Sequence, residues 1–299
     1  MRPVFVIGAE RSGTTILGSV LGAPTDGLTI PESHFFVENV LSHSRQAEFP
    51  SELPKIWKNI ARNPRFQLWD WQVDTATEKA LIKNPTVQSF WQSLVREYGK
   101  TVGRPSPSYW VDHTPMHALH ITALIDLFPE ARFVHIVRDP RAVAASILSL
   151  RWGPATREDF PGYWLQKVGC ALMGQITFPN KFSLVKYEDF IASPEETLKI
   201  LSKNLDLPHL DSRLPLHFKV PAASNKQHSY LNSGIIAGVS SNWEERLTVS
   251  DVEYLEGALG GLMDVLGYGR QFPDARLTYG VSRVNKKKWD SIIGRLTGE

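Results

Sequence analysis

The sequence predicts an α/β fold in which a parallel β-sheet is flanked by helices, and three observations support this. Short apolar runs suited to buried strands alternate with helical patterns, and such alternation is typical of a parallel sheet with helices on both faces. Several of these runs are followed directly by polar or charged residues. The first run leads into a glycine-bracketed turn and a helix, an arrangement that binds anions through free backbone N–H groups.

Length and composition limit the classes of protein to consider. The chain has 299 residues, a net charge of +2 and one cysteine, Cys170. We expect residues 1–299 to form a single domain, in a reducing, cytoplasmic setting. The small net charge and the lack of a dense basic stripe argue against nucleic acid as a partner. No apolar run approaches the ~20 residues that span a bilayer, and a strand beginning at Val4 leaves no room for a cleaved signal.

The first predicted strand is Val4 to Ile7, and a turn bounded by Gly8 and Gly13 follows it. Apolar residues behind the turn recur at helical spacing on one stripe. These are Ile16, Leu17, Val20 and Leu21. The turn therefore lies between a strand end and a helix N-terminus, where the helix dipole favours negative charge.

The spacing of this turn matches a P-loop, in which lysine and then serine or threonine follow the second glycine. Here Thr14 stands at the lysine position, and Thr15 follows it. We expect Arg11, inside the turn, to replace the missing cation, because a guanidinium can bind two oxyanion oxygens at once. The alternative is a plain tight turn with an exposed arginine.

A second predicted strand, Gly27 to Ile30, leads to Glu32 and His34. A carboxylate and an imidazole just past a strand end suit proton transfer. The alternative is that Glu32 caps the following helix and His34 only packs against its neighbours.

Residues 42–108 have a different composition, with four tryptophans and several prolines, and they predict a helical cap. We expect helices at Leu53 to Ala61 and Val87 to Tyr98, interrupted by the prolines. Most of the tryptophans are expected to be buried within the cap. The alternative is that the cap forms an aromatic wall of an acceptor pocket.

The strand predicted at Tyr109 to Val111 ends in Asp112 and His113. Thr114 then suits a helix N-cap and Pro115 the first helical position. His113 therefore lies between a strand end and a helix start, either as a site residue or as a buried, hydrogen-bonded histidine.

The strand predicted at Arg132 to Val137 ends in Arg138. Asp139 suits the N-cap of the next helix, and Ser146 lies about two turns further on along the same stripe. Arg138 and Ser146 could therefore reach one anion together. The alternative for Arg138 is an ion pair with Asp139 or another neighbour.

A fifth strand is predicted at Phe182 to Tyr187, and we interpret Tyr187 to Asp189 as structural. Residues 206–270 are expected to form loops and helices that close over a ligand, with Lys226 as a candidate ligand-binding residue. Residues 271–299 form a basic tail, which suits a solvated helix or contact with a membrane surface.

In parallel sheets, ligands bind at the carboxyl ends of the strands. Four predicted strands deliver polar groups to that edge, and two of these groups suit anion binding while two can titrate. The residues alone therefore predict an enzyme that transfers a group from an anionic nucleotide.

Two motifs resemble the sulfotransferase family when taken together. They are Arg11-Ser12-Gly13-Thr14-Thr15 and the run from Arg138 to Ser146. The resemblance covers roughly residues 3–245, but not the tail beyond about 270. It extends to four further segments: Asp112 to Pro115, Phe128 to Phe133, Tyr187 to Asp189, and Trp243.

The resemblance implies a P-loop-like sulfotransferase architecture and a donor, 3'-phosphoadenosine 5'-phosphosulfate (PAPS), whose product is the bisphosphate PAP. It implies that Arg11, Ser12, Gly13, Thr14 and Thr15 hold the 5'-phosphosulfate. Arg138 and Ser146 would hold the 3'-phosphate, and Lys226 is a further candidate for donor binding. No metal is expected, because a sulfuryl group carries less charge than a terminal phosphoryl group.

The segment Glu32 to Phe36 is similar to the one that supplies the catalytic glutamate in glycan-type and tyrosylprotein-type sulfotransferases. The resemblance implies that Glu32 is the general base and that His34 assists it. His113 stands where the family commonly has a lysine, so a role in steadying the transferring group or in acid–base chemistry is open to it. The acceptor is expected to be a small molecule, lipid or glycan with a hydroxyl or amine.

Two other functions remain as alternatives. One is a P-loop-like kinase or NTPase, against which Thr14 counts because it replaces the lysine. The other is a nucleotide-binding protein without catalysis. The oligomeric state cannot be predicted from the sequence.

Overall fold

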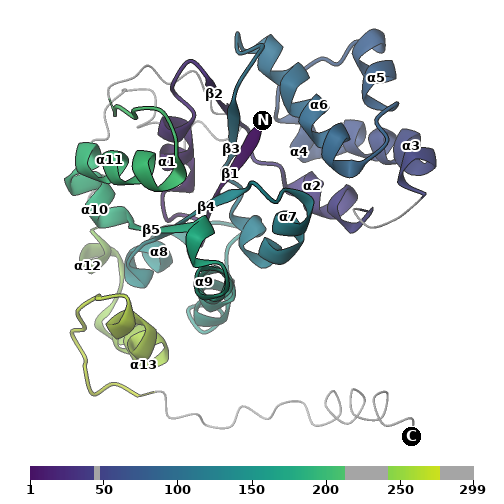
Figure 1. Ribbon diagram of the computed structural model, residues 1–299. Coiled ribbons are helices and arrows are strands. Elements are labelled where there is room, and N and C mark those ends of the chain that lie inside the picture. The colour runs from purple at the N-terminus through teal and green to yellow at the C-terminus, as the bar shows by residue number, and fades with distance from the viewer. Residues whose placement is uncertain (44–47, 213–241, 277–299) are drawn as a thin grey trace, which may run out of the picture. The chain divides into compact units, whose positions relative to one another are not determined.

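Five parallel strands make one sheet, in the order β2-β3-β1-β4-β5 (Figure 1). Their bounds are β1 (Arg2–Ile7), β2 (Gly27–Ile30), β3 (Tyr109–Asp112), β4 (Arg132–Val137) and β5 (Phe182–Lys186). All five predicted strands are thus confirmed, and so is the α/β class. The strand β1 lies between β3 and β4, with Phe5 paired to Asp112 on one side and to Phe133 on the other.

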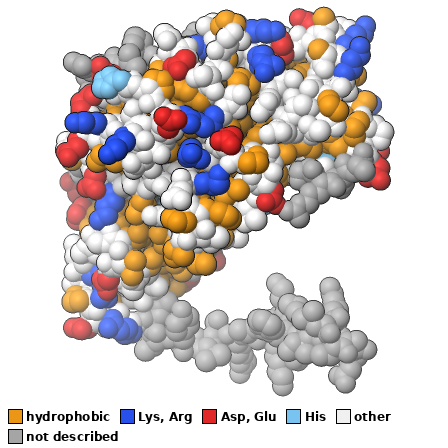
Figure 2. Space-filling model, viewed as in Figure 1, with side chains coloured by type: hydrophobic (Ala, Val, Ile, Leu, Met, Phe, Trp, Pro, Cys, Tyr) orange, Lys and Arg blue, Asp and Glu red, His pale blue; other side chains and the backbone are white. Residues whose placement is uncertain are grey.

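The computed structural model describes residues 1–43, 48–212 and 242–276. The chain divides into two compact units, Met1–Trp243 and Glu244–Glu299. The single domain over residues 1–299 stays a prediction. In the described ranges, no helix combines the length and the apolar character that crossing a membrane requires. On the face shown in Figure 2, acidic and basic side chains are interspersed, in keeping with the net charge of +2.

Side chains alternate between the two faces of the sheet because successive strand residues point in opposite directions. Val4 and Val6 of β1 face the helices α1 (Thr14–Leu21), α10 (Tyr187–Ala192) and α11 (Pro194–Leu205). Phe5 and Ile7 face the opposite core, which contains residues of α7 (Ile121–Leu127), α9 (Phe160–Thr177) and the cap. Helices therefore cover both faces of the sheet. The polar groups of the candidate site lie in the loops at the strand ends.

The predicted cap lies between β2 and β3, and its helices gather beside the sheet (Figure 1). Within the predicted bounds, residues 42–108, lie α3 (Phe49–Arg62), α4 (Pro64–Gln67), α5 (Thr75–Leu81) and α6 (Val87–Thr101), and α2 (His34–Asn39) and η1 (Leu41–His43) lead into them. Trp57, Trp69 and Trp91 are buried, as expected. Pro54 lies inside α3 and does not end it. Burial of the apolar face of α3 outweighs the one backbone hydrogen bond that a proline removes.

The remaining helices of the first unit are η2 (Pro115–Leu119), α8 (Pro140–Ile147) and η3 (Pro179–Lys181). The short α12 (Trp243–Arg246) follows, and α13 (Val249–Val265) belongs to the second unit. Thr248 and Asp251 form a capping box at the start of α13. The buried carboxylate of Glu256 accepts hydrogen bonds from the N–H groups of Gln271 (3.0 Å) and Phe272 (2.6 Å). Residues 213–241 of the predicted ligand-closing segment and residues 277–299 of the predicted basic tail lie outside the described residues.

His135 of β4 makes the stability of the sheet depend on pH. The side chain is fully buried, and within the described ranges neither ring nitrogen has a hydrogen-bond partner. Burial disfavours the charged imidazolium and lowers the pKa of His135 from 6.5 to about 4. The native state therefore excludes a proton that the unfolded state binds below pH 6.5.

We expect His135→Leu to reduce the loss of stability on acidification. Between pH 7 and pH 5, the wild-type protein should lose about 2 kcal/mol more unfolding free energy than the variant, because only the wild-type unfolded chain gains this proton. Urea unfolding at the two pH values measures the difference. His209→Leu, at an exposed histidine, should keep the wild-type dependence. An unchanged pH dependence in His135→Leu would contradict the assignment.

Candidate active site

The carboxyl ends of the strands bring together segments that are far apart in the sequence. The loop after β1 contains Gly8 to Gly13, the loop after β2 contains Glu32, and the loop after β3 contains His113. Arg138 follows β4 directly. Because β1 is hydrogen-bonded to β3 and β4, the loops that were predicted to share one edge of the sheet do so.

The loop after β1 has a backbone that glycine makes possible. Gly8 has a φ of 150°, and a Cβ there would lie 2.2 Å from the carbonyl oxygen of Ile136. Gly13 has a φ of 96° and is the N-cap of α1, so the first N–H groups of that helix face the loop. Arg11 adopts a left-handed φ of 68° without being a glycine. Such strain costs on the order of 1 kcal/mol and is typical of ligand-binding loops.

Arg11, Arg138 and Ser146 meet at this loop. The Nε atom of Arg11 donates to Ser146 Oγ at 3.0 Å. The Nη1 atom of Arg138 donates to the backbone carbonyl of Arg11, also at 3.0 Å. The three residues are separated by up to 135 positions in sequence. The predicted pair of anion-binding motifs is therefore one connected group, although its role in donor binding stays a prediction.

Tyr187, which was predicted to be structural, contacts this group. The guanidinium of Arg138 lies 4.3 Å from the centre of the Tyr187 ring. The same ring packs against the loop, since a Cβ on Gly13 would lie 2.5 Å from Tyr187 Cδ2. The alternative partner for Arg138, Asp139, instead pairs with Arg141 at 2.7 Å. The ring thus orients Arg138 without neutralising its charge.

Glu32 lies between two histidines. His34 Nε2 is 3.0 Å from Glu32 Oε2, and His113 Nδ1 is 3.8 Å from Glu32 Oε1. The N-cap of α2 is Ser33, so Glu32 does not cap that helix. The indole N–H of Trp69 donates to the backbone carbonyl of Glu32 at 3.2 Å. The cap therefore contacts the residue that was predicted to be the general base.

His113 is buried at the end of β3, against α1. A Cβ on Gly18 would lie 2.7 Å from His113 Cβ, so this close approach requires a glycine. Burial lowers the pKa of His113 below its usual 6.5, although the nearby Glu32 carboxylate opposes that effect. His113 is consequently uncharged near neutral pH, which differs from the permanent charge of the lysine that the family commonly has there.

A buried network around Asp112 joins the loops that carry Glu32 and His113. Asp112 accepts a hydrogen bond from Ser33 Oγ and one from Thr114 Oγ1, the latter at 2.6 Å. His117 Nε2 lies 2.9 Å from Asp112 Oδ2. The N–H of Ser33 donates to Thr114 Oγ1 at 2.7 Å, which closes the network. Both residues that flank this network in sequence, Glu32 and His113, belong to the candidate site.

The pKa of Asp112 reflects this network. Burial alone would raise the pKa, but the charge and hydrogen bond of His117 and the hydrogen bonds of Ser33 and Thr114 outweigh burial, and the pKa falls to about 2. Asp112 was predicted to lie at this edge of the sheet, but its partners Ser33, Thr114 and His117 were not predicted. The sequence offered only a weak indication of these partners, because Ser33 and His117 lie near predicted helix starts and such residues are common there.

The remaining predicted residues of the loop are close to these groups. Ser12 is fully buried, and Thr14 and Thr15 are buried at the start of α1. Lys226 lies outside the described residues. In the part of the chain that the structure describes, no cluster of three or more His, Cys, Asp or Glu side chains is arranged to hold a metal ion.

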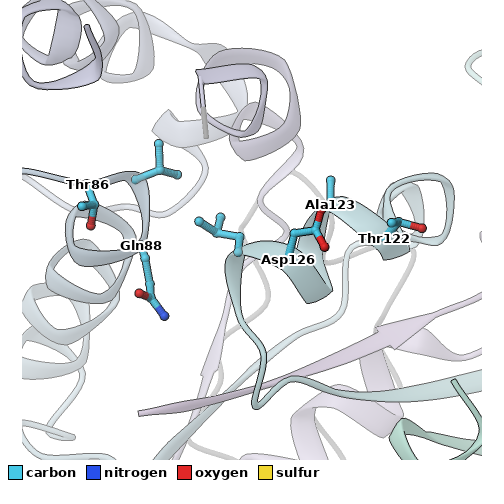
Figure 3. A pocket seen from close by; sticks show the side chains of 7 residues that line it. Thr86, Gln88, Thr122, Ala123 and Asp126 are labelled. Atoms are coloured by element: carbon cyan, nitrogen blue, oxygen red, sulfur yellow. The ribbon is translucent and has the colours of Figure 1, made fainter. Parts of the chain in front are cut away.

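A cavity of about 770 Å³ lies elsewhere, between the start of α6 and the helix α7 (Figure 3). Its lining includes Thr86, Gln88, Thr122 and Asp126. None of the described candidate residues lines it. The candidate site at the strand ends is therefore separate from this cavity.

A model of the Sulfotransferase family matches residues 3–211. The chain belongs to this family and is accordingly a transferase. The match spans both anion-binding motifs and the segment with Glu32, so it includes every described residue of the candidate site.

Several characterised relatives support the same assignment. The omega-hydroxy-beta-dihydromenaquinone-9 sulfotransferase Stf3 of Mycobacterium bovis is 26% identical over 92% of this chain and 78% of its own length. The protein-tyrosine sulfotransferase 1 of Danio rerio is 22% identical over 71% of this chain and 55% of its own. The carbohydrate sulfotransferase 4 of Mus musculus is 30% identical over 45% of this chain and 41% of its own.

Solved structures support the sulfotransferase architecture. The sulfotransferase domain of the curacin biosynthetic pathway covers 89% of this chain and 98% of its own, with 20% identity and a TM-score of 0.57. The sulfotransferase domain of the Synechococcus PCC 7002 olefin synthase covers 90% of this chain and 95% of its own, with 18% identity and a TM-score of 0.58. These two structures show that the fold is shared.

We expect Asp112→Asn to destabilise the protein and to slow turnover. An amide cannot accept all the hydrogen bonds that the buried carboxylate accepts, and breaking a buried charged network costs about 3 kcal/mol or more. Because Glu32 and His113 lose their fixed positions, kcat should fall while the affinity for PAP changes little. Urea unfolding, calorimetry and turnover measure the three effects.

Asp274→Asn, at an exposed position of the second unit, is the control and should change stability by less than about 0.5 kcal/mol. A stable Asp112→Asn with normal kcat would contradict the positioning role of the network.

Proposed function

We propose that this chain transfers the sulfuryl group of PAPS to a hydroxyl group of an organic acceptor, with Glu32 as the general base. The observation that carries the proposal is the contact of Arg11 with Arg138 and Ser146 at the anion-binding loop, at the same edge of the sheet as Glu32. Membership of the sulfotransferase family supports the reaction class. The donor and the base are our inferences from the residues around them.

Two buried polar atoms support the presence of an anionic ligand. The Oγ atom of Ser12 and the Nε atom of Arg138 are buried, and neither has a hydrogen-bond partner among the described residues. Buried donors without partners are costly in a folded protein, and phosphate or sulfuryl oxygens would satisfy both. Ser12 belongs to the loop after β1 and Arg138 to the end of β4, so these donors suit the two ends of one nucleotide.

The loop after β1 and the N-terminus of α1 would bind the 5' end of the donor. Their N–H groups, together with the Arg11 guanidinium, stabilise negative charge as it develops on the leaving phosphate oxygens. When bound, the donor supplies a sulfuryl group, whose bond to the phosphate oxygen breaks as the acceptor oxygen attacks. Thr14, which stands where a kinase has lysine, disfavours transfer of a terminal phosphoryl group.

Glu32 would accept the proton of the acceptor hydroxyl. Its side chain is 38% accessible, His34 Nε2 is within hydrogen-bond distance of one carboxylate oxygen at 3.0 Å, and His113 Nδ1 lies 3.8 Å from the other. A positioned general base contributes about 10²–10⁴-fold to turnover. His34 orients the carboxylate, and the uncharged His113 can donate a hydrogen bond to it or to the transferring group.

The acceptor would enter from the side of the cap. Trp69 contacts the backbone of Glu32 and belongs to the buried aromatic cluster of the cap. An aromatic wall beside the base suits an organic acceptor with an apolar part. The relatives are named for sulfation of omega-hydroxy-beta-dihydromenaquinone-9, protein tyrosine and carbohydrate. Each of these carries a hydroxyl, which is why we place a hydroxyl rather than an amine here.

We expect Glu32→Gln to lower kcat by about 10²-fold or more, since the amide cannot accept the proton. Because Glu32 does not belong to the anion-binding loop, the affinity for PAP should stay within about twofold of wild type, the scatter expected when no bound contact is lost. The assay measures transfer from radiolabelled PAPS to a panel of phenols, long-chain primary alcohols and sugars, with PAP affinity measured by calorimetry.

Glu38→Gln, at an exposed residue of α2, the helix that follows Glu32, is the matched control and should behave as wild type. Equal losses of turnover and PAP affinity in Glu32→Gln would show that Glu32 is structural. A wild-type protein that neither binds PAP nor transfers label to any member of the panel would contradict the proposed function.

A further inference from the structure

A buried lysine of α9, Lys167, contacts the anion-binding loop after β1 although it lies far from this loop in sequence. Lys167 is only 3% exposed, and its Nζ atom lies 3.1 Å from Glu10 Oε2. The same Nζ atom lies 3.7 Å from the centre of the Tyr163 ring. Tyr163 and Lys167 are four residues apart on α9, so they share one face of the helix. Neither residue was identified from the sequence.

Burial of this lysine requires a compensating charge. Removing an ammonium group from water is costly unless it is paired and hydrogen-bonded. Glu10 supplies the negative charge, and the Tyr163 ring supplies a cation–π contact. Burial, the charge of Glu10 and a hydrogen bond to Glu10 all raise the pKa of Tyr163. Tyr163 therefore stays protonated, and its hydroxyl donates a hydrogen bond to Glu10.

Glu10 directly precedes Arg11, the loop residue with the left-handed backbone. The Arg11 backbone is held through its carbonyl by Arg138, and its side chain is held by Ser146. The ion pair between Glu10 and Lys167 is a third attachment, from a different helix. An unpaired carboxylate at Glu10 would also repel an anion bound in the same loop, so its neutralisation favours binding.

We propose that Lys167 is a positioning residue for the donor: it holds Glu10, neutralises its charge and thereby keeps the anion-binding loop in its binding conformation. This inference rests on the proposed function only for the identity of the donor. Lys167 acts through Glu10 and need not touch the bound nucleotide.

A double-mutant cycle between Lys167 and Glu10 tests the proposal, with PAP as the ligand and calorimetry as the measurement. Lys167→Met leaves the Glu10 carboxylate without its cation, and the Kd for PAP should rise about 10-fold or more. Glu10→Gln alone should raise it less than about threefold, because this variant loses the attachment of the loop to α9 but leaves no carboxylate to repel the anion. The double variant should return to within about threefold of Glu10→Gln, since no unpaired charge remains.

Steady-state kinetics separate positioning from a general loss of structure. In Lys167→Met, the KM for PAPS should rise while kcat at saturating donor stays within about threefold of wild type, as expected when ground-state and transition-state binding weaken together. Lys167→Arg keeps the charge and should restore most of the affinity. Lys199→Met, at an exposed lysine of α11, is the matched control and should bind PAP as wild type does. If Lys167→Met does not fold, Lys167→Gln takes its place in the cycle.

Three results would overturn the proposal. The first is unchanged PAP affinity in folded Lys167→Met. The second is a double variant as weak as Lys167→Met, because Lys167 would then act on the ligand without Glu10. The third is a loss of kcat with no change in KM. If wild type binds inorganic pyrophosphate but not PAP, the proposed function fails, while the same cycle with pyrophosphate still decides the role of Lys167.

Discussion

The hydrogen bond from Arg138 to the backbone carbonyl of Arg11 is the interaction on which the rest of the site depends. It joins the loop after β1 to the end of β4, and these strands are neighbours in the sheet. It also brings the Arg138 guanidinium to the loop that contains Arg11, and two cations at one site favour a bound anion. A loop held in this way is organised for an anion before the anion arrives, so little ordering entropy is lost on binding.

Several buried side chains at the strand ends hold the candidate site residues in place. Asp112 holds Ser33 and Thr114, which flank Glu32 and His113. Tyr187 supports Arg138, and Lys167 pairs with Glu10 beside Arg11. Each of these contacts links a residue near the reaction to a different strand or helix. The geometry of the site is therefore a property of the whole sheet edge, and single loops do not determine it.

Much of this arrangement could be predicted from the sequence. Apolar runs with polar ends identified all five strands, because burial and periodicity are local signals. The same signals placed Arg11, Glu32, His113 and Arg138 at one edge. The contacts of Lys167, Tyr187 and Asp112 could not be found, because they depend on which helix packs against which loop. Pro54 is an example of a local signal that misleads. A proline usually ends a helix, but α3 continues through Pro54 because its apolar face packs against the core.

The central claim is that the loop containing Arg11 and the strand end containing Arg138, which are joined by a hydrogen bond, bind opposite ends of one nucleotide. Calorimetry of PAP against adenosine 5'-phosphate tests this most directly, because the two ligands differ only in the 3'-phosphate. A charge-assisted contact to Arg138 predicts that PAP binds at least about 10-fold more tightly. In Arg138→Met this preference should disappear. Equal affinity of the wild-type protein for the two nucleotides would contradict the account.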